Sequence, residues 1–227
     1  MLRTLRLVAG KDLRIEARSR VAANQVLPLA VLVLVLFAFA LDPDSGVLRR
    51  ATPGLFWLTV LFALVFTVQR SFALETADDA QDMLRLSALE PAGIFLGKAA
   101  ALLAELLLLE LGLGVGIIVL YDAPTRAAGV VLLLVAAVAA TCGLAAVGTL
   151  YGGLAAGLRV RDTLLPLLLL PVVAPVLIGA SRAFEAALGI GDRAISEGWP
   201  WVGLLTVFAL AYTALGLVVF GPLMEES

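Results

Sequence analysis

The chain of 227 residues is 62% apolar and 15% charged, with a mean hydropathy of +1.05, whereas soluble domains are about half apolar and about a quarter charged. This composition indicates one integral membrane domain spanning 1–227, and the net charge of −2 gives no electrostatic case for nucleic-acid binding. The sequence lacks histidine, the commonest haem ligand and general base, and its one cysteine, Cys142, excludes an internal disulfide.

Residues 1–25 predict an interfacial helix with a basic side. Leu2, Leu5, Ala9 and Leu13 recur at helical spacing between charged residues. These charged residues are Arg3, Arg6, Lys11, Asp12, Arg14, Glu16, Arg18 and Arg20. The alternative is a plain charged tail that only orients the first membrane span.

Six apolar runs predict six membrane helices. They cover residues 26–41, 55–68, 94–120, 127–158, 163–180 and 201–220. The first run is shorter than the ~20 residues that a bilayer requires, so its flanks should contribute. Ala38-Phe39-Ala40 resembles a signal-peptidase site, but the charged region before it is long and carries both signs, which favours an uncleaved span. We expect a turn-rich loop at 42–50 and a fifth span broken by its three prolines.

The distribution of basic residues predicts the orientation. Six spans place both termini on one side, together with residues 70–98 and 159–161, and this side carries eleven Lys and Arg residues against five on the other. The positive-inside rule therefore predicts that both termini lie in the cytoplasm.

Two acids, Glu105 and Glu110, interrupt the third run. An ionised side chain at a helix centre costs roughly 2.5–3.5 kcal/mol, whereas each large apolar residue favours insertion by roughly 0.3–0.6 kcal/mol. The run should insert, and a spacing of five residues turns the two acids about 140° apart. They form a substrate path or proton site, or they are hydrogen-bonded or protonated side chains that face the bundle interior. The small-residue pairs Gly112/Gly116, Gly148/Gly152 and Gly153/Gly157 predict close helix packing within a bundle or a dimer.

The largest polar stretch after the N-terminal arm is 70–98, between the second and third runs. An amphipathic cytoplasmic helix in its part 70–93 would give a separate ATPase a docking surface, with acids pairing to basic residues and apolar residues filling a groove. The candidate docking residues are Glu75, Asp78, Asp79, Asp82, Met83, Leu84, Arg85 and Leu86. Pro91 should end this helix. The alternative is a solvated loop whose charges keep it out of the lipid.

Sequence motifs give no catalytic or nucleotide-binding site. The segment from Gly93 to Ala99 departs from a phosphate loop, because three residues separate its glycines and Ala99 follows Lys98 where Ser or Thr is needed. Gly112-Leu-Gly114-Val-Gly116 lies inside an apolar run without the acceptor acid of a dinucleotide fingerprint. We therefore expect a non-enzymatic membrane protein.

Four stretches carry a resemblance to a known family. They are KDLRIEARSR at 11–20, the segment 39–72 with LDPDSGVLRRATPGLFWL and a Gln-Arg-Ser-Phe exit, ETADDAQDMLRLSALEP at 75–91, and LPLLLLPVVAPVLI at 165–178. In this order and spacing the chain resembles the CcmB family, the ABC-type permeases of the haem exporter in the cytochrome c maturation system. It departs from the family where Asp79-Ala80 replaces an acid–Gly step and Ser87-Ala88 precedes a later Pro91.

The resemblance implies an all-α membrane protein with six helices of the ABC-2-like exporter type and a coupling helix between spans 2 and 3. It also implies a dimer in the bacterial inner membrane, above two copies of an ABC ATPase that binds ATP, with a haem-handling membrane protein, a further small membrane protein and a periplasmic haem chaperone. Either haem, the cargo, crosses the membrane, or ATP hydrolysis releases the haem-loaded chaperone from the haem-handling protein. The lack of histidine favours release, and we expect this chain to bind no cofactor itself.

Two further functions stay open from the residues alone: an ABC-2-type permease for another cargo, such as a lipid-linked sugar or a drug, and a scaffold for maturation factors that needs no ATP. Arg49 and Arg50, on the outer side, could contact a haem propionate or an acidic partner. The alternative for both arginines is ordinary interfacial snorkelling.

Overall fold

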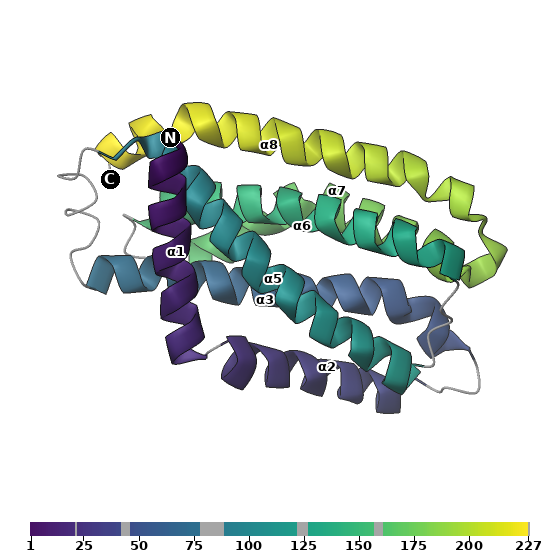
Figure 1. Cartoon of the computed structure of the whole chain (residues 1–227). Helices are drawn as coiled ribbons and strands as arrows, with labels where there is room; N and C mark the ends of the chain where they lie inside the picture. The colour runs from purple at the N-terminus through teal and green to yellow at the C-terminus, as the bar shows by residue number, and fades with distance from the viewer. Residues whose placement is uncertain (21, 42–45, 78–88, 122–126, 157–160, 227) are drawn as a thin grey trace.

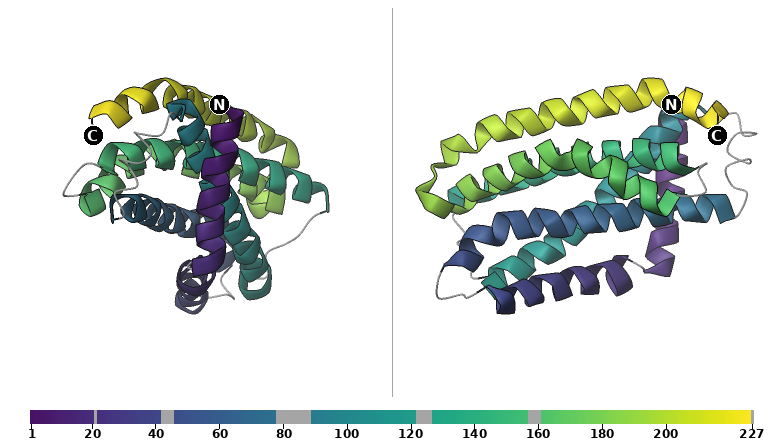
Figure 2. Two further views of the ribbon diagram at one scale, coloured as in Figure 1. Left: turned by 60° about the vertical axis from the view of Figure 1, so that its left-hand side comes forward. Right: turned by 180° about the vertical axis from the view of Figure 1, so that it is seen from behind.

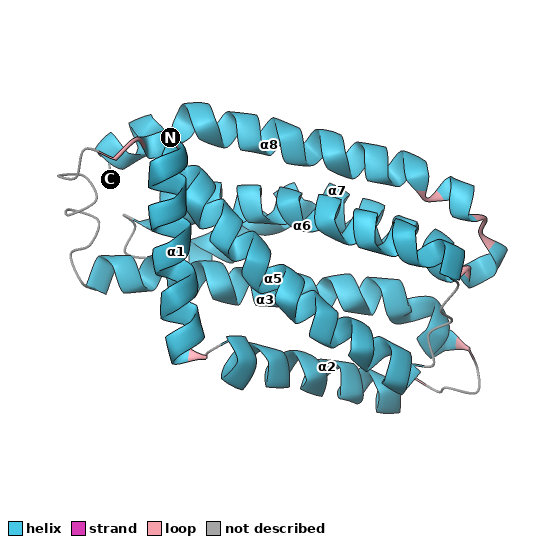
Figure 3. Ribbon diagram, viewed as in Figure 1, coloured by secondary structure: helices cyan, strands magenta, loops and turns pink. Residues whose placement is uncertain are grey.

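The computed structural model describes residues 1–20, 22–41, 46–77, 89–121, 127–156 and 161–226, and within these ranges it contains helices and no strand (Figures 1 and 3). The helices are α1 (Leu2–Ser19), η1 (Ala22–Val26), α2 (Leu27–Ala40), α3 (Val47–Ala77), α5 (Pro91–Tyr121), α6 (Ala127–Ala156), α7 (Arg161–Leu188), the short η2 (Ile190–Asp192) and η3 (Ile195–Glu197), and α8 (Trp199–Glu226). The predicted all-α class is confirmed.

Five helices of the described chain are long and apolar enough to cross a membrane: α3, α5, α6, α7 and α8. The first predicted span corresponds to α2, whose 14 residues reach only about 21 Å at 1.5 Å per residue. A sixth span exists if α1 and α2 are counted together as one helix pair, bent by 51°. The chain is thus a multi-pass membrane protein, and its first span is the least regular.

Both chain termini lie at one end of the helix bundle, called the terminal end below (Figures 1 and 2). The last turns of α3 and the first turns of α5 lie at this end too. α1 runs across the bundle at the terminal end, whereas the long helices run along it. The interfacial position of the N-terminal helix stays a prediction.

Small residues bring the long helices together. A Cβ atom added to Gly152 of α6 would lie 2.4 Å from the Phe72 ring of α3, and one added to Gly112 or Gly116 of α5 would lie 3.1–3.2 Å from leucines of α2. Gly112, Gly116 and Gly152 therefore pack against neighbouring helices within the bundle. Gly157 lies outside the described residues. At the opposite end, the Trp57 ring of α3 lies 5.1 Å from the Phe184 ring of α7.

Three predicted boundaries are wrong. α7 continues through Pro166, Pro171 and Pro175, because neighbouring helices can satisfy the backbone groups that proline frees in a membrane. The predicted loop at 42–50 already becomes helix at Val47, where Gly46, at φ +67°, turns the chain into α3. The predicted interfacial helix at 1–25 ends at Ser19, and Arg20 adopts a left-handed conformation that closes it.

Candidate functional site

The inner face of α1 packs on the first turns of α5. Thr4 and Val8 are buried, at 6% and 3% exposure. A Cβ atom on Gly93 would lie 2.6 Å from Thr4 Cβ, and one on Gly97 would lie 2.7 Å from Val8 Cβ. Only glycine permits this approach, because real Cβ contacts are not that short. The two glycines thus form a notch that fixes where α1 crosses α5.

Ion pairs extend this crossing to α3. Asp12 Oδ2 lies 3.6 Å from Lys98 Nζ of α5, and Glu16 pairs with Arg70 of α3. Arg70 Nη2 also donates a hydrogen bond of 2.7 Å to Ser19 Oγ. The set formed by Thr4, Val8, Asp12 and Glu16 on α1 with Arg70, Gly93, Gly97 and Lys98 is called the α1 clamp. It joins α1 to the helix that leads into the segment 78–88 and to the helix that follows it.

Lys98 is the most deeply buried charged group of the α1 clamp. Its side chain is 4% exposed, and its Nζ lies 4.6 Å from the centroid of the Phe72 ring. A buried ammonium group needs such compensation, because its transfer from water without partners is very unfavourable. The clamp is therefore an internal electrostatic contact, unlike an exposed surface pair.

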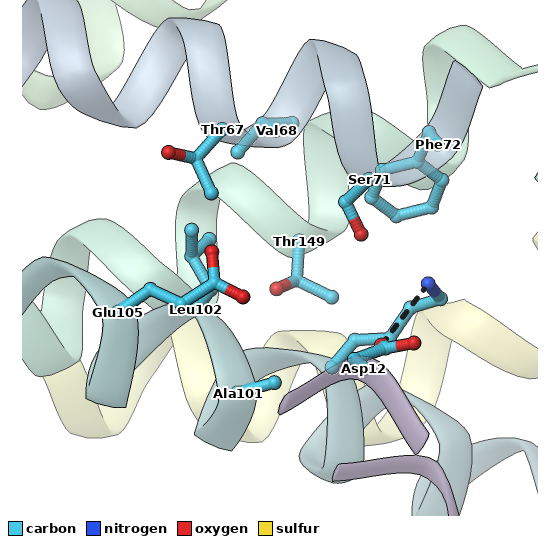
Figure 4. Close-up of a pocket in the computed structure, with 10 residues that line it drawn as sticks. Asp12, Thr67, Val68, Ser71, Phe72, Ala101, Leu102, Glu105 and Thr149 are labelled. Atoms are coloured by element: carbon cyan, nitrogen blue, oxygen red, sulfur yellow. Dashed lines mark ion pairs between the residues drawn. The ribbon is translucent and has the colours of Figure 1, made fainter. Parts of the chain in front are cut away.

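A small polar cavity lies behind the Asp12–Lys98 pair (Figure 4). Its volume of about 20 Å³ is enough for one water molecule. The carboxyl group of Glu105 and the hydroxyls of Ser71 and Thr149 point into it, from α5, α3 and α6 respectively. The other lining residues are Asp12, Thr67, Val68, Phe72, Lys98, Ala101 and Leu102. Polar side chains from four helices thus meet at the level of the clamp.

Glu110 lies apart from this cavity. It is 6% exposed, and its Oε1 accepts a hydrogen bond of 2.5 Å from Thr141 Oγ1 of α6. Its Oε2 is buried without a hydrogen-bond partner among the described residues. Glu105 and Glu110 therefore face different neighbours, and within the described ranges no three His, Cys, Asp or Glu side chains could together hold a metal ion.

The sequence comparisons identify the family. The family model described as CcmB protein matches residues 3–221. The chain belongs to the CcmB family. The protein called "Heme exporter protein B" of Pseudomonas aeruginosa is 28% identical over 93% of both chains, and its namesake in Paracoccus denitrificans is 29% identical over 92% of both. The Bradyrhizobium diazoefficiens protein of the same name is 30% identical over 91% of this chain and 90% of its own.

Other predicted site residues of this CcmB family member lie away from the clamp or outside the described residues. Lys11, Arg14 and Arg18 point outward from α1, and Arg49 and Arg50 are exposed in the first turn of α3, at the end opposite the termini. Asp78, Asp79, Asp82, Met83, Leu84, Arg85 and Leu86 lie outside the described residues, as does the side chain of Glu75. ATPase docking through these residues stays a prediction.

Sequence reasoning missed the glycine notch. Gly93 and Gly97 have the same small-xxx-small spacing as the glycine pairs inside the apolar runs. Because Lys98 follows them, they invite comparison with a phosphate loop instead. The structure explains both features together, since the glycines admit α1 and Lys98 pairs with its Asp12.

Proposed function

We propose that this chain is the membrane permease of an ABC-type complex for cytochrome c maturation. It couples ATP hydrolysis by a separate ATPase chain to haem export or to release of the haem-loaded periplasmic chaperone. Membership of the CcmB family, relatives named as haem exporters, and a bundle of long apolar helices support this proposal.

The α1 clamp is the observation that carries the coupling part of the proposal. The segment 78–88 is joined through the backbone to α3 and α5, and Arg70 of α3 and Lys98 of α5 each pair with an acid of α1. Because Glu16 and Asp12 lie on one helix, we expect the two flanks of the segment to move together with α1. A partner that binds the predicted docking residues would thereby act on α1, α3 and α5 together.

Release of the loaded chaperone is the favoured form of this function. The sequence contains no histidine, and Cys142 is half-buried within α6, so this chain offers poor axial ligation for haem. We expect the purified chain to show no strong Soret absorption band with one equivalent of haem. A strong band at that ratio would refute this choice and favour passage of haem through the chain.

The proposed complex places this chain in the bacterial inner membrane as a homodimer, with the ABC ATPase, the haem-handling membrane protein, the small membrane protein and the haem chaperone. We place the terminal end in the cytoplasm, because the predicted topology assigns eleven of the sixteen Lys and Arg residues to the side of the two termini. Arg49 and Arg50 then face the periplasm. If they contact a haem propionate or an acidic partner, replacing both with Gln lowers cytochrome c assembly, and unchanged assembly leaves only interfacial snorkelling.

The two acids of α5 are candidates for a functional path. Glu105 lines the polar cavity and Glu110 lies about 7.5 Å further along the helix at 1.5 Å per residue. We expect Glu105→Gln and Glu110→Gln to lower cytochrome c assembly at unchanged protein level. Full assembly in both variants would assign the two acids to packing alone.

Charge reversal at Asp78, Asp79 and Asp82 tests the coupling. In cells that lack the native chain, the triple Lys variant should lose holocytochrome c and ATPase stimulation while the protein still reaches the membrane. Cytochrome c assembly that does not depend on this chain at all would favour a permease for another cargo. Assembly that persists with an inactive ATPase would favour a scaffold.

A further inference from the structure

The outward face of α1 forms a basic groove. It is lined by Arg6, Leu7, Gly10, Arg14, Ile15 and Arg18 and encloses about 380 Å³. Lys11 completes one wall and pairs with Asp12 at 3.1 Å. None of the residues of the α1 clamp lines the groove.

The centre of the basic groove is open because of Gly10. A Cβ atom at this position would meet nothing within 4 Å. Arg6 and Arg14 stand four residues before and after it, so their side chains lie on the same face of the helix, and Arg18 continues the row. Several guanidinium groups around an open space suit a phosphate group, because the planar donors of arginine match phosphate oxygens.

Large apolar side chains lie between these arginines. Leu7 is 54% exposed and Ile15 is 41% exposed, each next to an arginine in the sequence. Water is an unfavourable environment for this surface, whereas the boundary between lipid headgroups and acyl chains suits both kinds of side chain. A free anion would neutralise the arginines and leave the apolar surface in water.

The position of α1 favours lipid over a protein partner. α2 begins at Leu27, soon after Arg18, and Leu29, Leu32 and Leu36 on it are 55%, 62% and 62% exposed. Such side chains face lipid in a membrane protein, so the end of α1 lies beside the edge of the apolar layer. The groove therefore lies at the depth at which phospholipid phosphates are found.

We propose that the basic groove binds the phosphate group of an anionic phospholipid, with Leu7 and Ile15 against its acyl chains. The bound lipid holds the outer face of α1 at the membrane surface while the clamp holds its inner face on the bundle. This proposal is independent of the cargo and of the ATPase.

Native mass spectrometry of the full-length, delipidated protein tests the proposal. The protein in detergent is titrated with dioleoyl phosphatidylglycerol and, separately, with dioleoyl phosphatidylcholine. We expect at least tenfold tighter binding of phosphatidylglycerol. In Arg6→Gln/Arg14→Gln/Arg18→Gln this affinity should fall about 100-fold, because each basic residue near an anionic lipid surface contributes about fivefold.

A control removes two exposed arginines at the opposite end of the bundle, as Arg49→Gln/Arg50→Gln, and should change the affinity less than twofold. An equal loss in the control, or equal binding of the two lipids by the wild type, would overturn the proposal. Inorganic phosphate or glycerol 3-phosphate that competes as tightly as the lipid would assign the groove to a free anion. A groove variant that keeps the lipid but loses the ATPase would assign it to a protein surface.

A second measurement locates the groove without changing its charge. Cys142 is the only cysteine of the sequence, so Leu7→Cys in a Cys142→Ala background carries one spin label. In phosphatidylglycerol bilayers the label should be more accessible to oxygen, which dissolves in lipid, than to a water-soluble nickel complex. The reverse order would place Leu7 in water and contradict the proposal.

Discussion

Removing the ammonium group of the α1 clamp tests its energetic role. Lys98→Met keeps most of the side-chain volume but leaves Asp12, 13% exposed, without its buried partner at 3.6 Å. Removing one member of a buried ion pair costs about 3–5 kcal/mol. Asp12 keeps a second contact, with Lys11 Nζ at 3.1 Å. We therefore expect Lys98→Met to lower the free energy of unfolding by the lower limit of this range, about 3 kcal/mol.

Equilibrium unfolding in mixed micelles of mild detergent and dodecyl sulfate, followed by circular dichroism, measures this cost. Lys11→Met is the control, because its exposed pair with the same carboxylate should contribute less than about 1 kcal/mol. In Asp12→Asn/Lys98→Met the loss should be smaller than the sum of the single losses by at least about 1 kcal/mol. Equal costs for Lys98→Met and Lys11→Met, or strict additivity in the double variant, would show that the buried Asp12–Lys98 pair does not stabilise the fold.

Three further substitutions test the packing. Gly97→Ala should destabilise the contact with α1 by about 1–3 kcal/mol and speed tryptic cleavage of α1, whereas Gly114→Ala, with open space around its Cβ, should not; equal cleavage rates would contradict the notch. Thr141→Val should cost about 1–3 kcal/mol in the same unfolding assay, because it leaves the buried Glu110 carboxyl without its donor; a neutral result would show that this hydrogen bond is not needed. Gly129→Ala should cost about 3 kcal/mol or more, since its Cβ would lie 2.0 Å from a carbonyl oxygen of α7, which cannot rotate away; a folded variant of unchanged stability would show that α6 and α7 can separate there.

The helices could be predicted because apolar runs of membrane length have few alternatives to helix. The predicted break in the fifth span was wrong because the rule that proline interrupts a helix comes from soluble proteins. In α7 the helix continues through Pro171. The start of α3 at Val47 was missed because Arg49 and Arg50 make its first turn look like a loop. Charge alone does not end a helix, and here Gly46 sets its beginning.

The α1 clamp could be predicted only in part. A charged, amphipathic helix at the N-terminus follows from the spacing of its residues, but Asp12 and Lys98 are far apart in the chain, and no periodicity shows that they meet. By contrast, the angle between Glu105 and Glu110 follows from helix geometry alone. In the structure, Glu105 accordingly lines the polar cavity, whereas Glu110 accepts a hydrogen bond from Thr141.

Co-purifying partners show whether this chain is the permease of an ATPase-driven maturation complex, as we propose. The tagged chain and its Asp78→Lys/Asp79→Lys/Asp82→Lys variant are purified from native membranes in mild detergent, the co-purifying proteins are identified and the absorption spectrum is recorded. We expect an ATPase and a haem-bearing partner with the wild type, and loss of the ATPase with the variant. A wild-type preparation without an ATPase, under conditions that keep other ABC complexes intact, would contradict this proposal.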